Sequence, residues 1–255
     1  MRFASLGSGS RGNATVVQAG STTLLIDCGF GVAETRRRLG RLGMDLSELT
    51  AILLTHEHAD HVAGVGAVAR AGRVPVWATP GTLAALAPQV GVLPEVRYIN
   101  CHAPWQIDGL AITPFPVPHD GRESCQYLLS DGSARFAAVT DLGHTTAHMR
   151  TVLAGCDGLL FECNHDRDLL LGGHYPAALK RRVDGDFGHL SNAAAAQFIA
   201  SLDCGRLKHF AAAHLSEQNN RPELARAAMA DALGCTADWI AVADQDAGLG
   251  WCDLA

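Results

Sequence analysis

The stretch His56-Glu57-His58-Ala59-Asp60-His61 constrains this chain more than any other feature of its sequence. It places three imidazoles and an aspartate within six residues and offers almost nothing apolar to bury. Packing alone does not explain such a stretch, because every buried polar side chain needs a partner. Imidazole nitrogens and carboxylate oxygens are ligands that divalent transition metals prefer. The stretch therefore predicts a metal site.

The spacing within the stretch predicts two ions rather than one. His56 and His58 are two residues apart in extended chain, so both rings can face one ion. Asp60 and His61 begin the helix expected next and diverge toward a second ion. Each ion takes about four to six nitrogen or oxygen ligands with one position open for water. Further ligands must therefore come from elsewhere in the chain.

The remaining candidates each follow an apolar, strand-like run: Asp27, His119, Asp141 and His214. Because strands of such sheets often end at one edge, these side chains can converge although they are far apart in the sequence. Asp141 is the expected bridging carboxylate, and Asp27 is expected to orient a ligand from behind. The first metal is assigned His56, His58 and His119, and the second is assigned Asp60, His61 and His214.

Strand and helix periodicities alternate along the chain and predict an α/β fold. Strands are expected over 14–18, 23–27, 51–55, 74–77, 110–117, 126–130, 135–140, 158–162 and 207–213, with a final hairpin of 239–243 and 248–252. Helices are expected over 32–42, 62–70, 80–86, 145–154, 191–201 and 222–233, with Thr79 and Ser191 as caps. This order predicts a four-layer αβ/βα sandwich. We expect one domain, 1–255, with pseudo-equivalent halves of about 1–115 and 116–255.

Composition sets limits on partners and location. Hydrophobic residues make up 48% and charged residues 18%, as in folded globular proteins. The net charge of −6 argues against holding nucleic acid by bulk electrostatics, although Lys180-Arg181-Arg182 forms a local basic cluster. No apolar run approaches the ~18 residues of a membrane span, and no signal peptide is visible. Eight scattered cysteines without a Cys-x-x-Cys pair suit a reducing cytosol, so a cytoplasmic protein without a membrane partner is expected.

The motif Thr55-His56-x-His58-x-Asp60-His61, preceded by Leu25-Ile26-Asp27-Cys28-Gly29, resembles the metallo-β-lactamase superfamily. His119, Thr140-Asp141 and His214 fit the remaining ligand motifs of that superfamily in order. A narrower resemblance, to its bacterial YycJ-like (WalJ-like) branch, is carried by residues 7–13, 161–166, 180–182, 188–192 and 213–220. That branch is associated with phosphodiester cleavage, specifically 5′-to-3′ exonuclease action on DNA. The resemblance implies the sandwich fold and a dinuclear metal-dependent hydrolase.

The implied mechanism uses two divalent ions, zinc or manganese with iron as a further option. Ions ~3.5–4 Å apart lower the pKa of a shared water and deliver a bridging hydroxide at neutral pH. Asp60 is expected to hold the proton of that water. His189, in Gly188-His189-Leu190-Ser191, is the first candidate for the general acid that serves the leaving group. The alternative for His189 is a histidine that enters a helix and bonds to backbone.

Several other residues are candidates for substrate contact or for support of the ligands. Ser8 and Asn13 lie in the glycine- and serine-rich loop 7–13, which either reaches a phosphate or is a tight turn. His165 either contacts substrate, supports a ligand or is structural. Lys180, Arg181 and Arg182 either clamp phosphates ahead of the scissile bond or form a solvated helix face.

Three functions remain open on these observations. The leading one is a phosphodiesterase acting on nucleic acid, DNA first. The alternative is hydrolysis of a small cyclic phosphodiester, lactone or thioester, because fold and metal ligands do not set the substrate. A metal-binding scaffold without catalysis is disfavoured, because it would be expected to lose ligands and this chain keeps them all.

Overall fold

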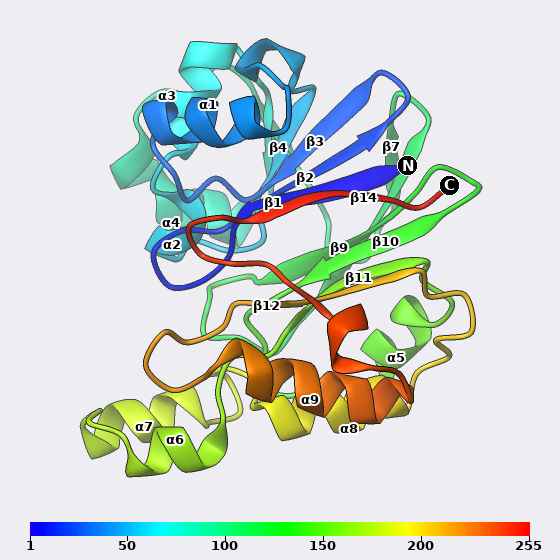
Figure 1. The fold of residues 1–255 in the computed structure, drawn as a ribbon. Helices are drawn as coiled ribbons and strands as arrows, with labels where there is room; N and C mark the ends of the chain where they lie inside the picture. The colour runs from blue at the N-terminus through cyan, green and yellow to red at the C-terminus, as the bar shows by residue number, and fades with distance from the viewer.

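The computed structural model describes residues 1–255 and is built on two seven-stranded sheets that face each other (Figure 1). The first sheet has the order β14-β1-β2-β3-β4-β5-β6 and the second β13-β12-β11-β10-β9-β8-β7. The strands of the first sheet are β1 (Arg2–Gly7), β2 (Ala14–Ala19), β3 (Thr22–Ile26), β4 (Ala51–Leu53), β5 (Val76–Ala78), β6 (Val96–Tyr98) and β14 (Leu249–Asp253). Those of the second are β7 (Trp105–Ile107), β8 (Leu110–Pro116), β9 (Cys125–Ser130), β10 (Arg135–Val139), β11 (Gly158–Glu162), β12 (His209–Ala213) and β13 (Ala241–Val242).

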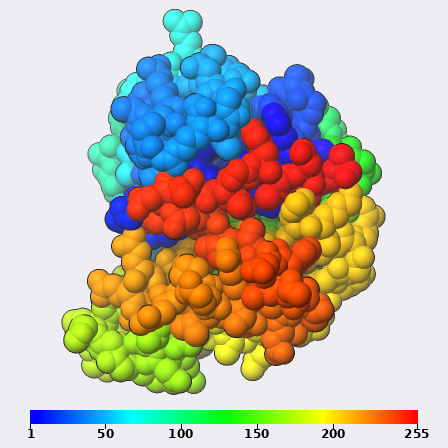
Figure 2. Space-filling model, viewed as in Figure 1, coloured from blue at the N-terminus to red at the C-terminus, as the bar shows by residue number.

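Helices cover the outer face of each sheet, so the predicted four-layer sandwich is confirmed (Figure 1). The first sheet carries α1 (Val32–Arg41), α2 (Ala59–Val62), α3 (Val65–Gly72) and α4 (Pro80–Val90). The second carries α5 (Ala147–Leu153), α8 (Asn192–Ala200) and α9 (Pro222–Leu233). Two short helices, α6 (Arg167–Gly172) and α7 (Ala177–Val183), form a hairpin that protrudes from the body, yellow-green at the lower left of Figure 2.

The sheets are apolar on both faces because each is covered on both sides. In β3 all five residues are buried: Leu24 and Ile26 face the second sheet, whereas Leu25 faces the helices. Between the sheets the rings of Phe3 and Phe136 stack with centroids 4.2 Å apart. This packing fixes the relative position of the sheets, and with it the edge at which their polar residues meet.

The caps at the helix starts follow the sequence prediction. The side chains of Thr79 and Ser191 accept hydrogen bonds from backbone N–H groups in the first turns of α4 and α8. Helix α4 runs on to Val90, beyond the predicted end at Leu86.

The predicted final hairpin is wrong. β13 pairs with β12 in the second sheet, and β14 pairs with β1 in the first, so the chain crosses between the sheets. Only an isolated bridge, Asp244 with Gly248, joins the two segments. The cause is that β1 and β12 each leave an open edge that one of these strands covers. β7 and β8 also lie in the second sheet, although nearly all of their residues fall in the predicted first half, 1–115.

Candidate metal centre

The candidate ligands gather where parallel strands end. β3 is parallel to β4, and β10, β11 and β12 are parallel to one another, so their carboxyl ends meet at one edge of the sandwich. Asp27, Asp141 and His214 leave their strands with φ of 61°, 62° and 54°. Such left-handed backbone costs a residue with a side chain about 1–3 kcal/mol and is kept where the surroundings and a function hold it. The three strained positions therefore mark one site.

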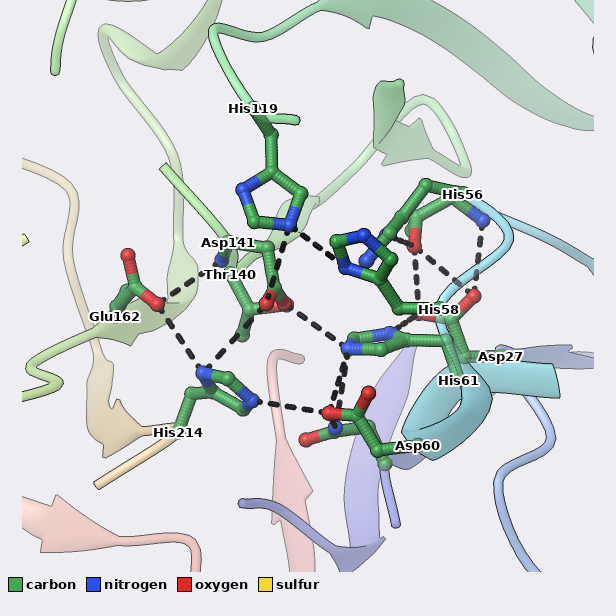
Figure 3. Close-up of polar contacts among 12 residues, drawn as sticks. Asp27, His56, His58, Asp60, His61, His119, Thr140, Asp141, Glu162 and His214 are labelled. Atoms are coloured by element: carbon green, nitrogen blue, oxygen red, sulfur yellow. Dashed lines mark hydrogen bonds and ion pairs between the residues drawn. The ribbon is translucent and has the colours of Figure 1, made fainter. Parts of the chain in front are cut away.

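The first predicted ligand group is assembled at this edge (Figure 3). The ring nitrogens of His56, His58 and His119 lie within 4.8 Å of one another. His58 Nδ1 is 3.1 Å from His119 Nε2, and the buried Nε2 of His56 has no hydrogen-bond partner. Nitrogen lone pairs this close need a proton or a cation between them.

The second predicted group lies beside it. Asp60 Oδ2 is 3.3 Å from His61 Nε2 and 3.4 Å from His214 Nε2. Asp141 lies between the groups: its Oδ2 is 3.1 Å from His61 Nε2 and its Oδ1 is 3.8 Å from His119 Nε2. The structure thus brings together all seven residues that the sequence assigned to metal.

The outer nitrogens of the rings are held from behind. His61 Nδ1 donates to Asp27 Oδ2 at 2.7 Å, which leaves Nε2 directed at the centre. The same carboxylate accepts from the backbone and hydroxyl of Thr55, and Thr55 Oγ1 lies 2.9 Å from His56 Nδ1. His119 Nδ1 donates to the carbonyl of Gly188 at 3.2 Å. Metal-binding histidines characteristically show this arrangement, with a group such as the Asp27 carboxylate behind the ring.

The donor set fits divalent cations. It consists of imidazole nitrogens and carboxylate oxygens, which suit first-row transition metals. The buried Nε2 of His56 makes no hydrogen bond, and Asp141 Oδ2 has only its ion-pair contact with His61, whereas buried polar atoms in proteins are normally hydrogen-bonded. Coordination to a cation would satisfy both.

The electrostatics of the cluster point the same way. Burial opposes charge on His214, yet the carboxylates of Asp141, Asp60 and Glu162 outweigh it and raise its pKa to about 10. Burial also disfavours the ionised form of Asp141, but His214 and His61 hold its pKa well below the usual range. The carboxylates are thus ionised and are stabilised by positive charge nearby, which comes from protonated histidines when no metal is bound.

Glu162 is a site residue that the sequence analysis did not assign. It ends β11, is fully buried, and its Oε1 is 2.8 Å from His189 Nδ1 and 3.2 Å from His214 Nδ1. Backbone N–H groups of Asp141 and Leu142 also donate to it. Burial would raise its pKa, but His189 and the other donors lower it to about 2. The sequence did hold a signal, since Glu162 follows the apolar run Gly158–Phe161 just as the ligands follow theirs.

The loop 7–13 holds two of the candidate ligands in place through hydrogen bonds. Ser8 Oγ accepts from the backbone N–H of His214 at 2.9 Å, and Asn13 Nδ2 donates to Asp60 Oδ2 at 3.0 Å. Both side chains are buried, so neither is presented to a phosphate; Ser10 of the same loop lines the cavity. The loop packs closely against residue 29, since a Cβ on Gly29 would lie 2.7 Å from the backbone nitrogen of Asn13.

Of the remaining candidates for substrate contact, His165, Lys180, Arg181 and Arg182, only Arg182 lines the cavity. His165 is fully buried, does not line the cavity, and lies 3.4 Å from Asp184 at the end of α7. Lys180 Nζ donates to the carbonyl of Leu171 within the hairpin, and Arg181 does not line the cavity. Arg182 does line it, donating to Asp120 Oδ2 at 2.9 Å.

The ligand groups open into a cavity of about 380 Å³. Its walls include Asp60, His119, Asp141, His189 and His214 on one side and Tyr175, Leu179 and Arg182 of the α6–α7 hairpin on the other. His189 is partly exposed there, with its Nδ1 turned back to Glu162. The site is therefore reached through a polar opening that the hairpin borders.

Sequence comparison agrees with this geometry. The profile of the β-lactamase superfamily domain matches residues 22–210. The chain belongs to the metallo-β-lactamase superfamily. Within this superfamily it is 34% identical over 235 residues to the exodeoxyribonuclease YycJ of Bacillus anthracis, covering 91% of this chain and 89% of that protein. It is 31% identical to the exodeoxyribonuclease WalJ of Streptococcus pneumoniae, covering 91% and 88%.

Solved structures of metallo-β-lactamase proteins share the fold. The metallo-β-lactamase fold protein YhfI from Bacillus subtilis superposes with a TM-score of 0.73 at 17% identity, covering 96% of each chain. The resemblance to the YycJ-like branch is thereby confirmed from the relatives, and the sandwich from the structures. None of the helices in this superfamily member is both long and apolar enough to span a lipid bilayer.

Proposed function

We propose that this chain is a metal-dependent phosphodiesterase that removes nucleotides from the 5′ end of DNA. The observation that carries the proposal is the clustering of seven metal-type donors in one centre, in a chain 34% identical to an exodeoxyribonuclease over 91% of its length. The cavity of about 380 Å³ lies toward the small end of ligand sites, which suits one nucleotide at a strand end better than a duplex.

In this proposal two zinc or manganese ions occupy the centre. His56, His58 and His119 would hold one ion, Asp60, His61 and His214 the other, and Asp141 would serve both. Such ions supply an activated water at neutral pH and offset negative charge on the phosphoryl oxygens. Asp27, Ser8, Asn13 and Glu162 hold the ligand side chains in place through the hydrogen bonds described above.

The protein's own residues complete the chemistry. Asp60 lies within reach of both His61 and His214 and is the candidate for holding the proton of the attacking water. His189 keeps Nδ1 on Glu162, which leaves Nε2 as the atom that donates a proton to the leaving oxygen. Arg182, at the rim, offers a planar guanidinium to a phosphate next to the scissile bond.

The proposal is tested with a substrate panel in the presence of manganese or zinc. We expect cleavage of bis-p-nitrophenyl phosphate and stepwise release of nucleotides from 5′-phosphorylated single-stranded DNA, both abolished by a chelator. RNA and a lactone are the comparison substrates. Cleavage of the lactone or of small phosphodiesters alone would instead identify a small-molecule hydrolase. Activity that is unchanged by the chelator would contradict the metal centre.

Arg182→Ala is expected to weaken binding of a 5′-phosphorylated single strand by roughly tenfold, because a charge-assisted phosphate contact is lost. The slope of log affinity against log salt should become shallower by about 0.7, the value for one phosphate contact on a single strand. Fluorescence anisotropy over a salt series measures both. Arg181→Ala on the same helix is the matched control, because Arg181 does not line the cavity. Equal effects of the two variants would refute the assignment of Arg182.

A further inference from the structure

A second depression lies next to the metal centre, and the proposed cleavage chemistry does not use it. It is lined by Pro118, His144, His148, His102 and Phe187. It borders the centre along the backbone, since Pro118 precedes His119 and Phe187 is two residues before His189. Two residues span at most about 7 Å, so the Cα atoms of Phe187 and His189 lie no farther apart than that.

Phe187 combines an exposed side chain with a fixed backbone. The residue is 59% exposed, so its aromatic ring is accessible to a ligand. A Cβ on Gly143 would lie 2.0 Å from the Asp186 carbonyl oxygen, and one on Gly188 would lie 2.1 Å from the Arg182 carbonyl oxygen. The backbone on both sides of Phe187 is thus packed against neighbouring segments, while its ring remains exposed.

His144 completes the surface around the ring. Its ring lies edge-on to Phe187, with centroids 6.4 Å apart and an interplanar angle of 75°. Its Nδ1 donates to the Asp186 carbonyl at 2.8 Å, which leaves Nε2 as a hydrogen-bond acceptor on the outer side. The depression therefore offers an aromatic face and a polar acceptor side by side.

We propose that this depression is a binding site for an unpaired nucleobase, with Phe187 as the stacking surface and His144 at the base edge. Every base has a π-face, so stacking on an exposed aromatic ring binds single strands with little sequence preference. The proposal rests on the proposed function and adds to it: the base next to the scissile phosphate must be unpaired, so single-stranded ends are the substrate. A metal site is not the explanation, because these histidines do not belong to any of the donor groups close enough to share an ion.

The kinetic test compares Phe187→Ala with Phe187→Trp. Phe187→Ala should raise KM for single-stranded DNA by roughly 5- to 150-fold, the loss of one stacked base, and should leave hydrolysis of bis-p-nitrophenyl phosphate unchanged. Phe187→Trp should keep KM near that of the unchanged protein. Leu171→Ala, an exposed apolar residue on α6, is the control for general loss of surface apolarity. An abasic nucleotide at the stacked position should raise KM for the unchanged protein and should have no further effect on KM for Phe187→Ala.

A binding test separates this proposal from the proposed function. Single strands with phosphorothioate linkages carry 2-aminopurine at successive positions, and its fluorescence is quenched on stacking whether or not the strand is cut. Quenching at one position that Phe187→Ala abolishes supports the site, even if the protein cleaves no DNA. DNA cleavage with identical KM and quenching in Phe187→Ala would overturn the site and leave the nuclease function standing. Absence of quenching in the unchanged protein would also overturn it.

Discussion

Replacement of Asp141 by alanine is expected to lower the hydrolysis of bis-p-nitrophenyl phosphate by at least about a thousandfold. Asp141 is the one carboxylate within 4 Å of both ligand groups, so its loss removes a donor from each proposed ion. The charge stabilisation that such ions give is worth several kcal/mol, and every ~1.4 kcal/mol is a factor of ten in rate. Metal analysis of the purified variant should show a lower metal content per chain.

Asp253→Asn is the control for this variant, because Asp253 is an exposed aspartate on β14 outside the cavity. Its activity and metal content should equal those of the unchanged protein. Circular dichroism of both variants establishes that the sheets are intact. If Asp141→Ala kept its metal and its activity, the two-ion centre proposed here would be wrong.

Glu162→Gln is expected to have the second large effect, on both stability and turnover. An amide offers one acceptor oxygen where the carboxylate offers two, so the donors to one of the two Glu162 oxygens lose their partner. Disruption of a fully buried ion pair typically costs about 3–5 kcal/mol of unfolding free energy. Because the proposed acid His189 loses its anchor, kcat should fall by about 100- to 10,000-fold, the usual contribution of a general acid. Denaturant unfolding and steady-state kinetics measure the two effects.

The double variant shows how the kinetic effect arises. If Glu162 acts on catalysis by positioning His189, then Glu162→Gln in the His189→Ala background should lower kcat little further. His189→Ala alone should keep its metal content while kcat falls. Fully multiplicative losses in kcat would instead mean that Glu162 supports the metal ligands independently of His189, through its contact with His214.

The seven metal-type residues were predictable because each stands at an abrupt change from apolar to polar sequence. Polar residues directly after buried strands have few structural uses, and parallel strands bring them to one edge. Glu162 shares this pattern, but a glutamate at the end of a strand carries no metal-specific spacing, and its partners His189 and His214 are distant in the sequence. Its role depends on tertiary contacts alone.

Strand pairing was the weakest part of the sequence prediction. The last two strands were expected as a hairpin because they are close in the sequence, yet each pairs with a strand formed much earlier. The α6–α7 hairpin escaped prediction as a wall of the site for a similar reason. Its short helices bury few side chains of their own, so no apolar period marks them.

The left-handed backbone at Asp27, Asp141 and His214 has a consequence for the history of the fold. Glycine or asparagine would adopt these conformations at lower cost, so folding alone does not favour an aspartate or a histidine there. If these residues serve the metal centre as proposed, selection for catalysis keeps them against that pressure. In a descendant that no longer uses the site, drift toward glycine or asparagine at these positions would relieve strain without unfolding the sheets. The residue types at three strand ends therefore record whether a lineage still uses its site.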